Sequence, residues 1–373
     1  MKMEMKVSEV KGALKKASII ASVNKEGVYK FLKLDLLNKT VMASNDSLSL
    51  VQDLKVKSQD TGSVLIEAKK FAEIVSVLDS ETVIKISVKD KRVTLTCNHS
   101  KFKLGTLPVE EFAEPRLSGK PLKIKLSSEV FRVALSKSIQ YASTLDVRPA
   151  LNGVLFSLDM TNESIDLVAS NGHYLSVERI SEMKVVIDDA DSCGEYIVSL
   201  ACAKVASDFA KDKDFIEVSF NENFIQISDG SQTLWGRMID ASFPDYKQIT
   251  TLIDKRQTDF TGVAVKDLKI SLDRVSTLVN SDGAVSISSQ ENKTTIQTVE
   301  SSLEKDVAID QVAHSFPIMG EKVVLAVKYL QKILSNSSNA EIGVIQEEEG
   351  GSLHFRQLIG NDISYQILMP RRA

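Results

Sequence analysis

Two hydrophobic periods alternate along this chain, and the alternation recurs three times. Over 7–22 the apolar residues lie three and four positions apart, with Lys11 and Lys15 on another side, which predicts an amphipathic helix. Runs in which polar and apolar residues alternate one by one predict half-buried strands between such helices. The pattern predicts helices over 7–22, 67–80, 127–143, 199–213, 264–280 and 326–338. The order helix, strands, helix, strands therefore occurs three times.

Each repeat spans about 120 residues, which is a normal domain size. Polar, turn-rich segments at 115–123 and 248–261 separate the repeats. We therefore expect an α+β protein with antiparallel sheets and helices on one face of each sheet. A single doubly wound α/β domain is the alternative, but it requires single strands between helices and a glycine-rich phosphate turn, which this sequence lacks. The expected domains are 1–122, 123–252 and 253–373.

The segment 148–179 is a candidate hairpin. The alternating run 164–170 predicts a strand, and a short apolar run before it predicts another. Asn171-Gly172 predicts a tight turn, because glycine adopts positive φ without a Cβ clash. The alternation resumes at Tyr174. From the pattern alone, a surface hairpin is the simplest interpretation.

The overall composition is that of a soluble globular protein, with 43% hydrophobic and 26% charged residues. No apolar run approaches the roughly 20 residues of a membrane span. The N-terminal residues are charged and have no apolar core of the signal-peptide kind. The three cysteines, Cys97, Cys193 and Cys202, are far apart and fit a reducing compartment better than a disulfide framework or a zinc site. We therefore expect a cytoplasmic protein.

Basic residues are concentrated in the predicted helices. These six segments contain 15 Lys and Arg against 9 Asp and Glu, whereas the rest of the chain carries a net charge of −10. Lysine is a good helix former, so ordinary surface helices also show such an excess. If the helices share one face, however, that face attracts the phosphate backbone without sequence preference. The absence of interleaved aromatic residues favours duplex over single-stranded nucleic acid.

No catalytic constellation is found in the sequence. The four histidines, His99, His173, His314 and His354, lack the spacing of zinc ligands. There is no phosphate-binding loop and no G-x-S-x-G elbow. Acidic pairs such as Glu110-Glu111 lie in polar runs typical of solvated loops. We expect no catalytic residue, metal or cofactor, with an enzyme that lacks a recognisable motif as an alternative.

Four stretches together resemble the bacterial DNA polymerase III β subunit family, the sliding clamps. RPALNGVLF and VASNGHYLSV, both within 148–179, resemble the signature of the family's middle domain. TLPVEEFAEP at 106–115 is similar to a segment near the end of the first domain, and MIDASFPDYKQI at 238–249 to the segment that closes the second. YQILMPRRA at 365–373 resembles the C-terminal tail. These stretches cover about a fifth of the chain, in the family's order and at spacings that fit three domains.

The resemblance implies a head-to-tail homodimer, a six-domain ring around duplex DNA with helices lining the hole and sheets outside. It also implies an apolar pocket for short peptides of polymerase subunits, the clamp loader and repair proteins. By match to the family's motifs, the pocket residues are Leu151, Ser170, Gly172, His173, Tyr174, Leu175, Pro244, Ile249, Ile367, Met369, Pro370, Arg371 and Arg372.

The ring implies DNA-facing and dimer-forming residues. The expected DNA contacts are Lys11, Lys15, Lys16, Lys25, Lys69, Lys70, Arg132, Lys137, Arg148, Lys204, Lys266, Lys269, Arg274, Lys328 and Lys332. The expected dimer interface places Phe102 and Leu104 of one protomer against Thr277 and Leu278 of the other.

The sequence also departs from the family. Tyr174 stands where the family more often has arginine, Arg371 where it has methionine, and Thr277 is less apolar than usual. The region 281–312 matches poorly. A clamp paralogue from a phage or mobile element that acts mainly as a protein-interaction scaffold is therefore the alternative function.

Overall fold

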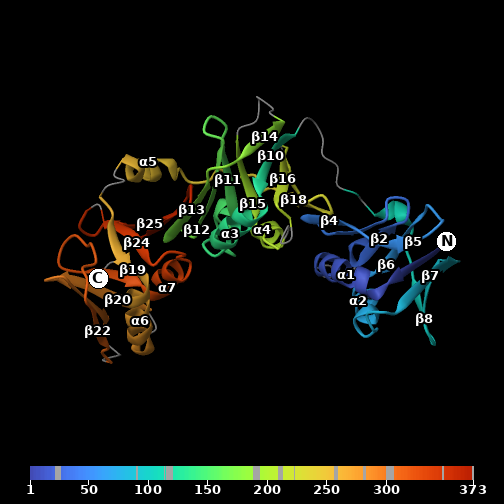
Figure 1. Cartoon of the computed structure of the whole chain (residues 1–373), viewed down its shortest axis with the longest axis horizontal. Coiled ribbons are helices and arrows are strands. Elements are labelled where there is room, and N and C mark those ends of the chain that lie inside the picture. Colours follow the sequence, from blue (N-terminus) through green and yellow to red (C-terminus); the bar gives the residue numbers. More distant parts are fainter. Residues whose placement is uncertain are drawn as a thin grey trace. The chain divides into compact units, whose positions relative to one another are not determined.

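The computed structural model describes residues 1–21, 27–89, 91–112, 114, 121–187, 194–208, 213–221, 223–255, 259–279, 283–299, 306–346 and 348–371. Its contacts group into two compact units. Unit 1 comprises Met1–Glu129, Val185–Ser192 and Asp208–Met238, and unit 2 comprises Val130–Lys184, Cys193–Ser207 and Ile239–Ala373. Both units combine antiparallel sheets with helices (Figure 1), so the predicted α+β class is confirmed.

Unit 1 is built on two antiparallel sheets. In spatial order, the first contains β5 (Val56–Lys57), β1 (Lys2–Lys6), β7 (Val83–Lys89), β8 (Arg92–Cys97) and β9 (Ser100–Gly105). The second contains β14 (Lys184–Ile187), β10 (Leu122–Ser127), β16 (Phe215–Phe220), β17 (Phe224–Ser228), β18 (Gln232–Arg237), β4 (Leu48–Asp53), β3 (Thr40–Ser44), β2 (Phe31–Asp35) and β6 (Ser63–Glu67). Two short 3-10 helices belong to this unit: η1 (Val28–Lys30) precedes β2, and η2 (Val109–Glu111) lies between β9 and β10.

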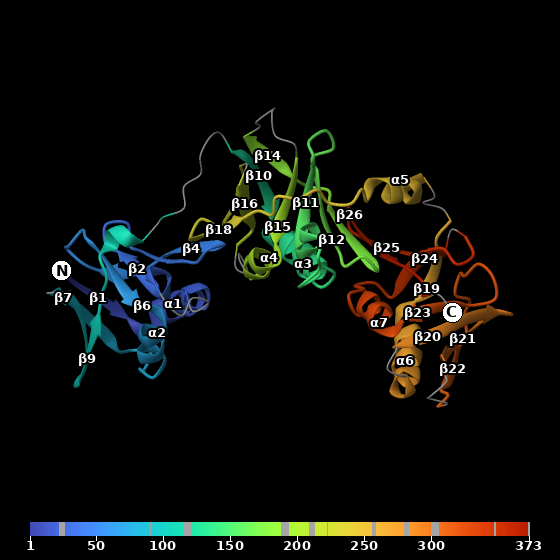
Figure 2. The same cartoon turned by 180° about the vertical axis from the view of Figure 1, so that it is seen from behind.

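Helices α1 (Val7–Ala21) and α2 (Ala68–Ser76) lie side by side in unit 1 (Figure 2). The predicted apolar face of α1 is buried, as Val7, Val10 and Leu14 show, and the helix packs on β3 and β4. Lys11 and Lys15 are exposed on its other side. The 3.6-residue period therefore gave the correct buried face, because only one stripe of a surface helix can reach the core.

Unit 2 also has two antiparallel sheets. The larger contains, in spatial order, β15 (Glu195–Ser199), β11 (Gly153–Asp159), β12 (Ser164–Ser170), β13 (Tyr174–Ile180), β26 (Asp362–Leu368), β25 (Leu353–Ile359), β24 (Glu341–Gln346) and β19 (Thr261–Ala264). The smaller contains β22 (Ile309–Val312), β21 (Lys293–Thr298), β20 (Ala284–Gln290) and β23 (Val323–Ala326). The 3-10 helices η3 (Pro149–Asn152) and η4 (Ser276–Leu278) belong to this unit. The pairing of β13 with β26 joins segments almost two hundred residues apart in one sheet.

The helices of unit 2 are α3 (Ser128–Ile139, from Val130 onward), α4 (Leu200–Ala206), α6 (Val265–Val275) and α7 (Val327–Ser335). Phe131 of α3 packs against Phe156 of β11, with 6.1 Å between ring centroids. Helix α6 contacts both α7 and β22. All six predicted helices are thus found, and α2, α3, α6 and α7 each end at least three residues before the predicted end.

A further helix, α5 (Lys247–Lys255), corrects the prediction of an irregular connection over 248–261. Its start is fixed by Asp245, whose Oδ1 accepts hydrogen bonds from the backbone N–H groups of Lys247 (3.0 Å) and Gln248 (3.4 Å). Aspartate before a helix satisfies backbone donors that have no partner within the first turn. Four of the five residues of α5 whose burial is described are exposed, which explains why the segment is polar. The prediction took this polarity as the mark of an irregular connection.

The segment 148–179 does not form a surface hairpin. Its strands β11, β12 and β13 occupy interior positions of the eight-stranded sheet, and every residue of β12 is buried. The predicted turn is correct, since Gly172 has φ of +87°. The polar residues of β12 indicated a strand with one face in water. Asp166 is nevertheless buried, because Arg179 donates hydrogen bonds to it inside the fold.

Several other expectations concern single features. Cys97 and Cys202 are buried free thiols, and Cys193 lies outside the described residues. In the part of the chain that the structure describes, no group of three or more His, Cys, Asp and Glu side chains is arranged to hold a metal ion. None of the described helices is long and apolar enough to cross a membrane.

Candidate functional site

The turn between β12 and β13 is fixed by its own side chains. Ser170 Oγ accepts a hydrogen bond from Gly172 N (3.0 Å) and donates one to Tyr174 O (2.9 Å). Asn171 Oδ1 accepts from the N–H groups of His173 (3.0 Å) and Tyr174 (3.3 Å). Asn and Ser side chains favour turns because they bond to nearby backbone groups. The turn therefore presents His173, which is exposed, in a defined position.

Arg148 lies against this turn. A Cβ on Gly172 would be 2.5 Å from its Nη2 atom, so only glycine allows the guanidinium to lie so close. The guanidinium bonds to both carboxylate oxygens of Asp146, at 2.9 and 3.0 Å, and lowers the pKa of Asp146 to about 2. Arg148 was predicted as a DNA contact, but the structure places it beside the predicted pocket residues.

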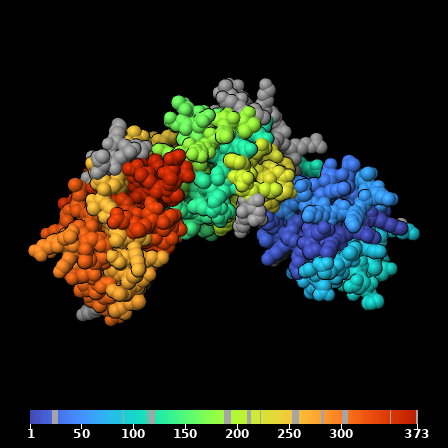
Figure 3. All heavy atoms as spheres, viewed as in Figure 1, coloured from blue at the N-terminus to red at the C-terminus, as the bar shows by residue number. Residues whose placement is uncertain are grey.

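The C-terminal tail runs next to the same turn. Strand β26 pairs with β13 so that Leu175 lies opposite Ile367. In Figure 3 the C-terminal residues (red) border residues from the middle of the chain (green). Beyond the strand, Met369 N donates to His173 O (3.0 Å) and Arg371 N donates to Val324 O (2.8 Å). The tail is thus held at two points, and Met369 remains 51% exposed.

An apolar cluster lies on the face of the sheet that carries Leu175. Its buried members include Val177, Tyr246, Tyr365 and Ile367, and the partly buried Leu175 and Phe243 pack against it. The Tyr246 hydroxyl bonds to Asp166 Oδ2 (3.1 Å), and Arg179 bonds to both Asp166 oxygens, at 2.8 and 3.1 Å. These contacts hold the segment before α5, which carries Pro244, on the face of the sheet with Leu175.

The predicted pocket residues divide by exposure. His173, Pro244, Ile249 (36% exposed), Met369 and Arg371 are exposed, and Leu175 and Pro370 are partly exposed. Leu151, Ser170 and Ile367 are buried, so they support the surface rather than form it. Phe243 belongs to the same cluster and was missed, although it stands in the FPDY stretch that the sequence singled out. Arg372 lies outside the described residues.

Tyr174 does not lie with Leu175 as predicted. Successive strand residues face opposite sides of a sheet, so its ring faces the side covered by α3 and α7. There it stacks on Tyr329 (4.2 Å between centroids) and packs against Tyr141 (4.7 Å). Burial, followed by the nearby Tyr329, raises its pKa to about 12.

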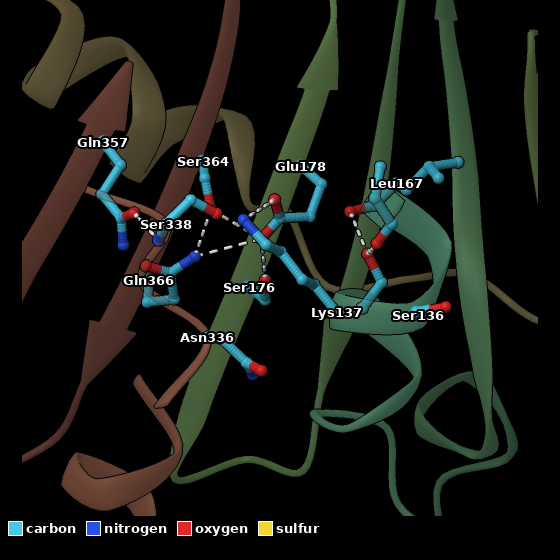
Figure 4. A network of polar contacts seen from close by, with 12 residues as sticks. Ser136, Lys137, Leu167, Ser176, Glu178, Asn336, Ser338, Gln357, Ser364 and Gln366 are labelled. Carbon is cyan, nitrogen blue, oxygen red and sulfur yellow. Dashed lines mark hydrogen bonds and ion pairs between the residues drawn. The ribbon is translucent and has the colours of Figure 1, made fainter. Parts of the chain in front are cut away.

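Lys137 is buried and is not a DNA contact. Its ammonium lies 4.0 Å from Glu178 Oε2 (Figure 4). Glu178 Oε1 accepts hydrogen bonds from Ser176 Oγ (2.9 Å), Ser364 Oγ (2.8 Å) and Gln366 Nε2 (3.0 Å). An ammonium that is enclosed by protein cannot reach a phosphate. The helical period placed Lys137 on α3 correctly but did not show that this position faces the sheet.

The other predicted DNA contacts are placed as follows. Arg132 and Lys269 are partly buried, and Lys332 donates to Gln140 O and to the Tyr174 hydroxyl. Lys70 is paired with Glu67 at 2.7 Å, and Arg274 with Asp310 at 3.2 Å. Lys25 lies outside the described residues. Among the predicted contacts, the exposed lysines on helices are Lys11, Lys15, Lys16, Lys69, Lys70, Lys204, Lys266 and Lys328.

The predicted dimer residues lie at the edges of their units. Phe102 and Leu104 are partly buried on β9, which is an edge strand of the five-stranded sheet. Thr277 and Leu278 form part of η4 in unit 2, and Leu278 is 46% exposed. An exposed leucine at the end of a helix and an edge strand are both features that protein interfaces cover.

The family of the DNA polymerase III beta subunit matches over most of the first two thirds of the chain. The model of its N-terminal domain matches residues 3–117 and that of its central domain matches 125–245, which together exceed half of the chain. A curated relative, the beta sliding clamp of Pseudomonas putida, is 20% identical over 314 residues, which span 84% of this chain and 83% of the relative.

Solved structures share the complete fold. A Pseudomonas aeruginosa sliding clamp bound to griselimycin has a TM-score of 0.87 at 18% identity, and a Helicobacter pylori beta clamp bound to a DNA ligase peptide has 0.87 at 16%. Both alignments cover 100% of each chain. The two domain models and the fold together show that this chain belongs to the DNA polymerase III beta subunit family, the beta sliding clamps.

Proposed function

We propose that this protein is a non-catalytic processivity factor: a homodimeric ring that encircles duplex DNA and holds polymerases and repair proteins by short peptides. Family membership supports this proposal, together with the surface next to the β12–β13 turn and the C-terminal tail, where Leu175 and Met369 are partly or fully exposed. We also propose three clamp domains, 1–122, 123–252 and 253–373, and a cytoplasmic location. Tethering raises the effective concentration of a polymerase at its template without any chemical step by the ring itself.

The proposed peptide site consists of Leu175, Phe243, Pro244 and Met369, with His173 at its rim. Leucine, proline and phenylalanine provide an apolar surface, and the flexible methionine adapts to different peptides. His173 and Arg371 are exposed groups that hydrogen-bond to a peptide backbone or side chain. Because the turn and the tail are tied by backbone hydrogen bonds, the surface exists before a peptide arrives, which limits the entropy lost on binding.

The proposed DNA contacts are the exposed lysines of α1, α2, α4 and α6. Contacts from lysine to phosphate do not depend on base sequence, so a ring lined by them slides. The overall charge of −4 fits this arrangement, since acidic residues elsewhere disfavour binding of nucleic acid over the whole surface.

The dimer is proposed through β9 and η4. Replacing the exposed Leu278 by aspartate is expected to give a monomer by light scattering, because the charge would be buried without a partner in the interface. The matched control is Ile270→Asp on α6, which has comparable exposure (41%) and lies outside the proposed interface. A dimer of unchanged stability in the Leu278 variant would contradict this interface.

The ring itself is tested by topology. The protein is loaded on a nicked circular plasmid, separated from free protein by gel filtration, and the plasmid is then cut once with a restriction enzyme. A ring stays on the circle and leaves the linear DNA from its ends. Equal retention on both forms would show ordinary surface binding and would contradict encirclement.

A further inference from the structure

Helix α7 contacts β26, and its side chains connect it to the β12–β13 turn on the helix-bearing side of the sheet. Asn171 Nδ2 donates to the Tyr329 hydroxyl at 3.1 Å. The Tyr329 ring is stacked on Tyr174, with a 26° angle between ring planes, and on His173 at 6.3 Å and 19°. One helix residue therefore contacts three of the four residues from Asn171 to Tyr174.

Lys332 completes the connection one turn later on α7. Its ammonium donates to Gln140 O (2.6 Å) and to the Tyr174 hydroxyl (3.1 Å), and it lies 5.4 Å from the centroid of the Tyr174 ring. The Tyr174 hydroxyl in turn donates to Gln140 O at 2.8 Å. Burial, with a smaller effect of Lys328, lowers the pKa of Lys332. The Lys332 ammonium is therefore held by Tyr174 and by Gln140, which directly follows α3.

The contacts continue to the proposed peptide site. The carbonyl of His173 accepts the hydrogen bond from Met369 N. Leu175, two residues further along the chain, packs against the apolar cluster. A shift of the turn would therefore move the exposed imidazole, the first residue of the tail and the start of β13 together. Sites of this kind are effective only when a second layer of residues fixes the ones that touch the ligand.

We propose that Tyr329 and Lys332 are positioning residues of the peptide site, which hold the turn and tail in the shape that a peptide recognises. The inference rests on the proposed peptide-binding function. It assigns Lys332 to the site and removes it from the DNA-contacting lysines. It also gives Tyr174 a role inside the fold, as the ring through which both α7 residues act.

Three variants and one control test the inference on the full-length dimer. Tyr329→Leu removes the stack and the bond from Asn171, Tyr329→Phe keeps the stack and removes the bond, and Lys332→Met removes both ammonium bonds. Lys293→Met, at an exposed position on β21, is the matched control for the loss of one lysine. Griselimycin and a DNA ligase peptide serve as probes, and affinity is measured by calorimetry below the melting temperature of every variant. Hydrogen exchange of the amides at 171–175 reports the turn directly.

Tyr329→Leu and Lys332→Met are expected to weaken binding of the probes about tenfold, which corresponds to the loss of an aromatic pair or a charged hydrogen bond. Exchange at 171–175 accelerates in both, while Tyr329→Phe stays near the unaltered protein. The control keeps full probe affinity, and Lys332→Met keeps full retention on circular DNA.

Unchanged affinity in folded Tyr329→Leu and Lys332→Met would overturn the inference while leaving the peptide site intact. If Lys332→Met keeps full probe affinity but is no longer retained on circular DNA, the inference is also overturned, because Lys332 would then be a DNA contact. If the unaltered protein binds neither probe, the peptide site itself is wrong and the inference falls with it. Should Tyr329→Leu fail to fold, Lys332→Met and the exchange data decide alone.

Discussion

At the scale of single residues, the carboxyl group of Glu178 is the least expected feature of this chain. It is buried in the centre of the eight-stranded sheet and receives three hydrogen bonds on one oxygen, whereas Lys137 lies 4.0 Å from the other. Burial raises its pKa to about 7, and Lys137 and the three donors partly counteract this rise. The free-energy cost of removing the charged carboxylate from water is therefore larger than the stabilisation that Lys137 and the three donors provide.

The raised pKa makes stability depend on pH. The folded state binds the Glu178 proton more tightly than the unfolded chain, in which the pKa is about 4.3. The free energy of unfolding therefore falls as pH rises from about 4.5 to about 7, by an amount on the order of 1–3 kcal/mol. Glu178→Gln, which cannot ionise, is expected to flatten this slope in urea titrations at pH 5, 6, 7 and 8.

Two further variants sharpen this test. Glu110→Gln, at an exposed carboxylate in η2, should keep the slope of the unaltered protein. Lys137→Met should steepen it and extend it to higher pH, because the remaining carboxylate loses its only nearby cation among the described contacts. A slope in Glu178→Gln equal to that of the unaltered protein would show that other groups cause the pH dependence.

At the scale of elements, the start of helix α5 is fixed by a local contact of the Asp245 side chain. Helix α5 begins where Asp245 bonds to the first free backbone N–H groups, and Gln248 Nε2 donates to its other oxygen at 2.8 Å. The helix begins directly after Tyr246, which belongs to the apolar cluster, so the start of α5 fixes the direction of the chain after the cluster.

Removing the cap is expected to loosen the start of α5. Asp245→Ala should cost about 1 kcal/mol of stability and accelerate hydrogen exchange at the first amides of the helix. Asp245→Asn keeps an acceptor oxygen and is the matched control, with a smaller effect. If both variants exchange like the unaltered protein, α5 does not depend on this cap.

The tail after β26 gives a second prediction at this scale. Deletion of Met369–Ala373 removes the hydrogen bonds to His173 O and Val324 O but leaves the pairing of β26 with β13. Probe binding should weaken about tenfold or more, while the dimer measured by light scattering is unchanged. Equal probe affinity in the truncated protein would exclude the tail from the site.

At the scale of the whole molecule, the distribution of lysines predicts how DNA is bound. Reversing Lys15, Lys69, Lys204 and Lys266 to glutamate changes four exposed positions on four helices. Affinity for nicked circular plasmid should fall strongly, and its dependence on salt should become shallower, because each lost phosphate contact lowers the slope by about 0.9.

The control for this prediction carries the same change in net charge. Lys55, Lys57, Lys293 and Lys322 are exposed and lie outside the helices, and their reversal to glutamate should leave plasmid binding close to normal. Equal losses in the two variants would mean that total charge, and not the helix surface, controls binding.

The sequence by itself determined six of the helices, the turn at 171–172 and the family. The helical period fixed the buried face of α1, the Asn171-Gly172 pair fixed the turn, and motif stretches fixed the likeness to the clamps, because each of these depends on residues close together in the chain. The sequence also placed Lys11, Lys69, Lys204 and Lys266 on helices correctly. It could not show that Lys137 faces the sheet, since burial depends on what packs against that side.

Only the tertiary structure decided which residues act together. Pairing of β13 with β26 brings the turn at 171–174 beside the tail, and packing of α7 brings Tyr329 and Lys332 to the same turn. No local pattern marks Tyr329 or Lys332 as partners of Tyr174, because more than 150 residues separate them and the contacts are made by side chains from different elements. The physical reason is that periodicity reports only which side of an element is buried, whereas the identity of the neighbour on that side is set by how distant elements pack together.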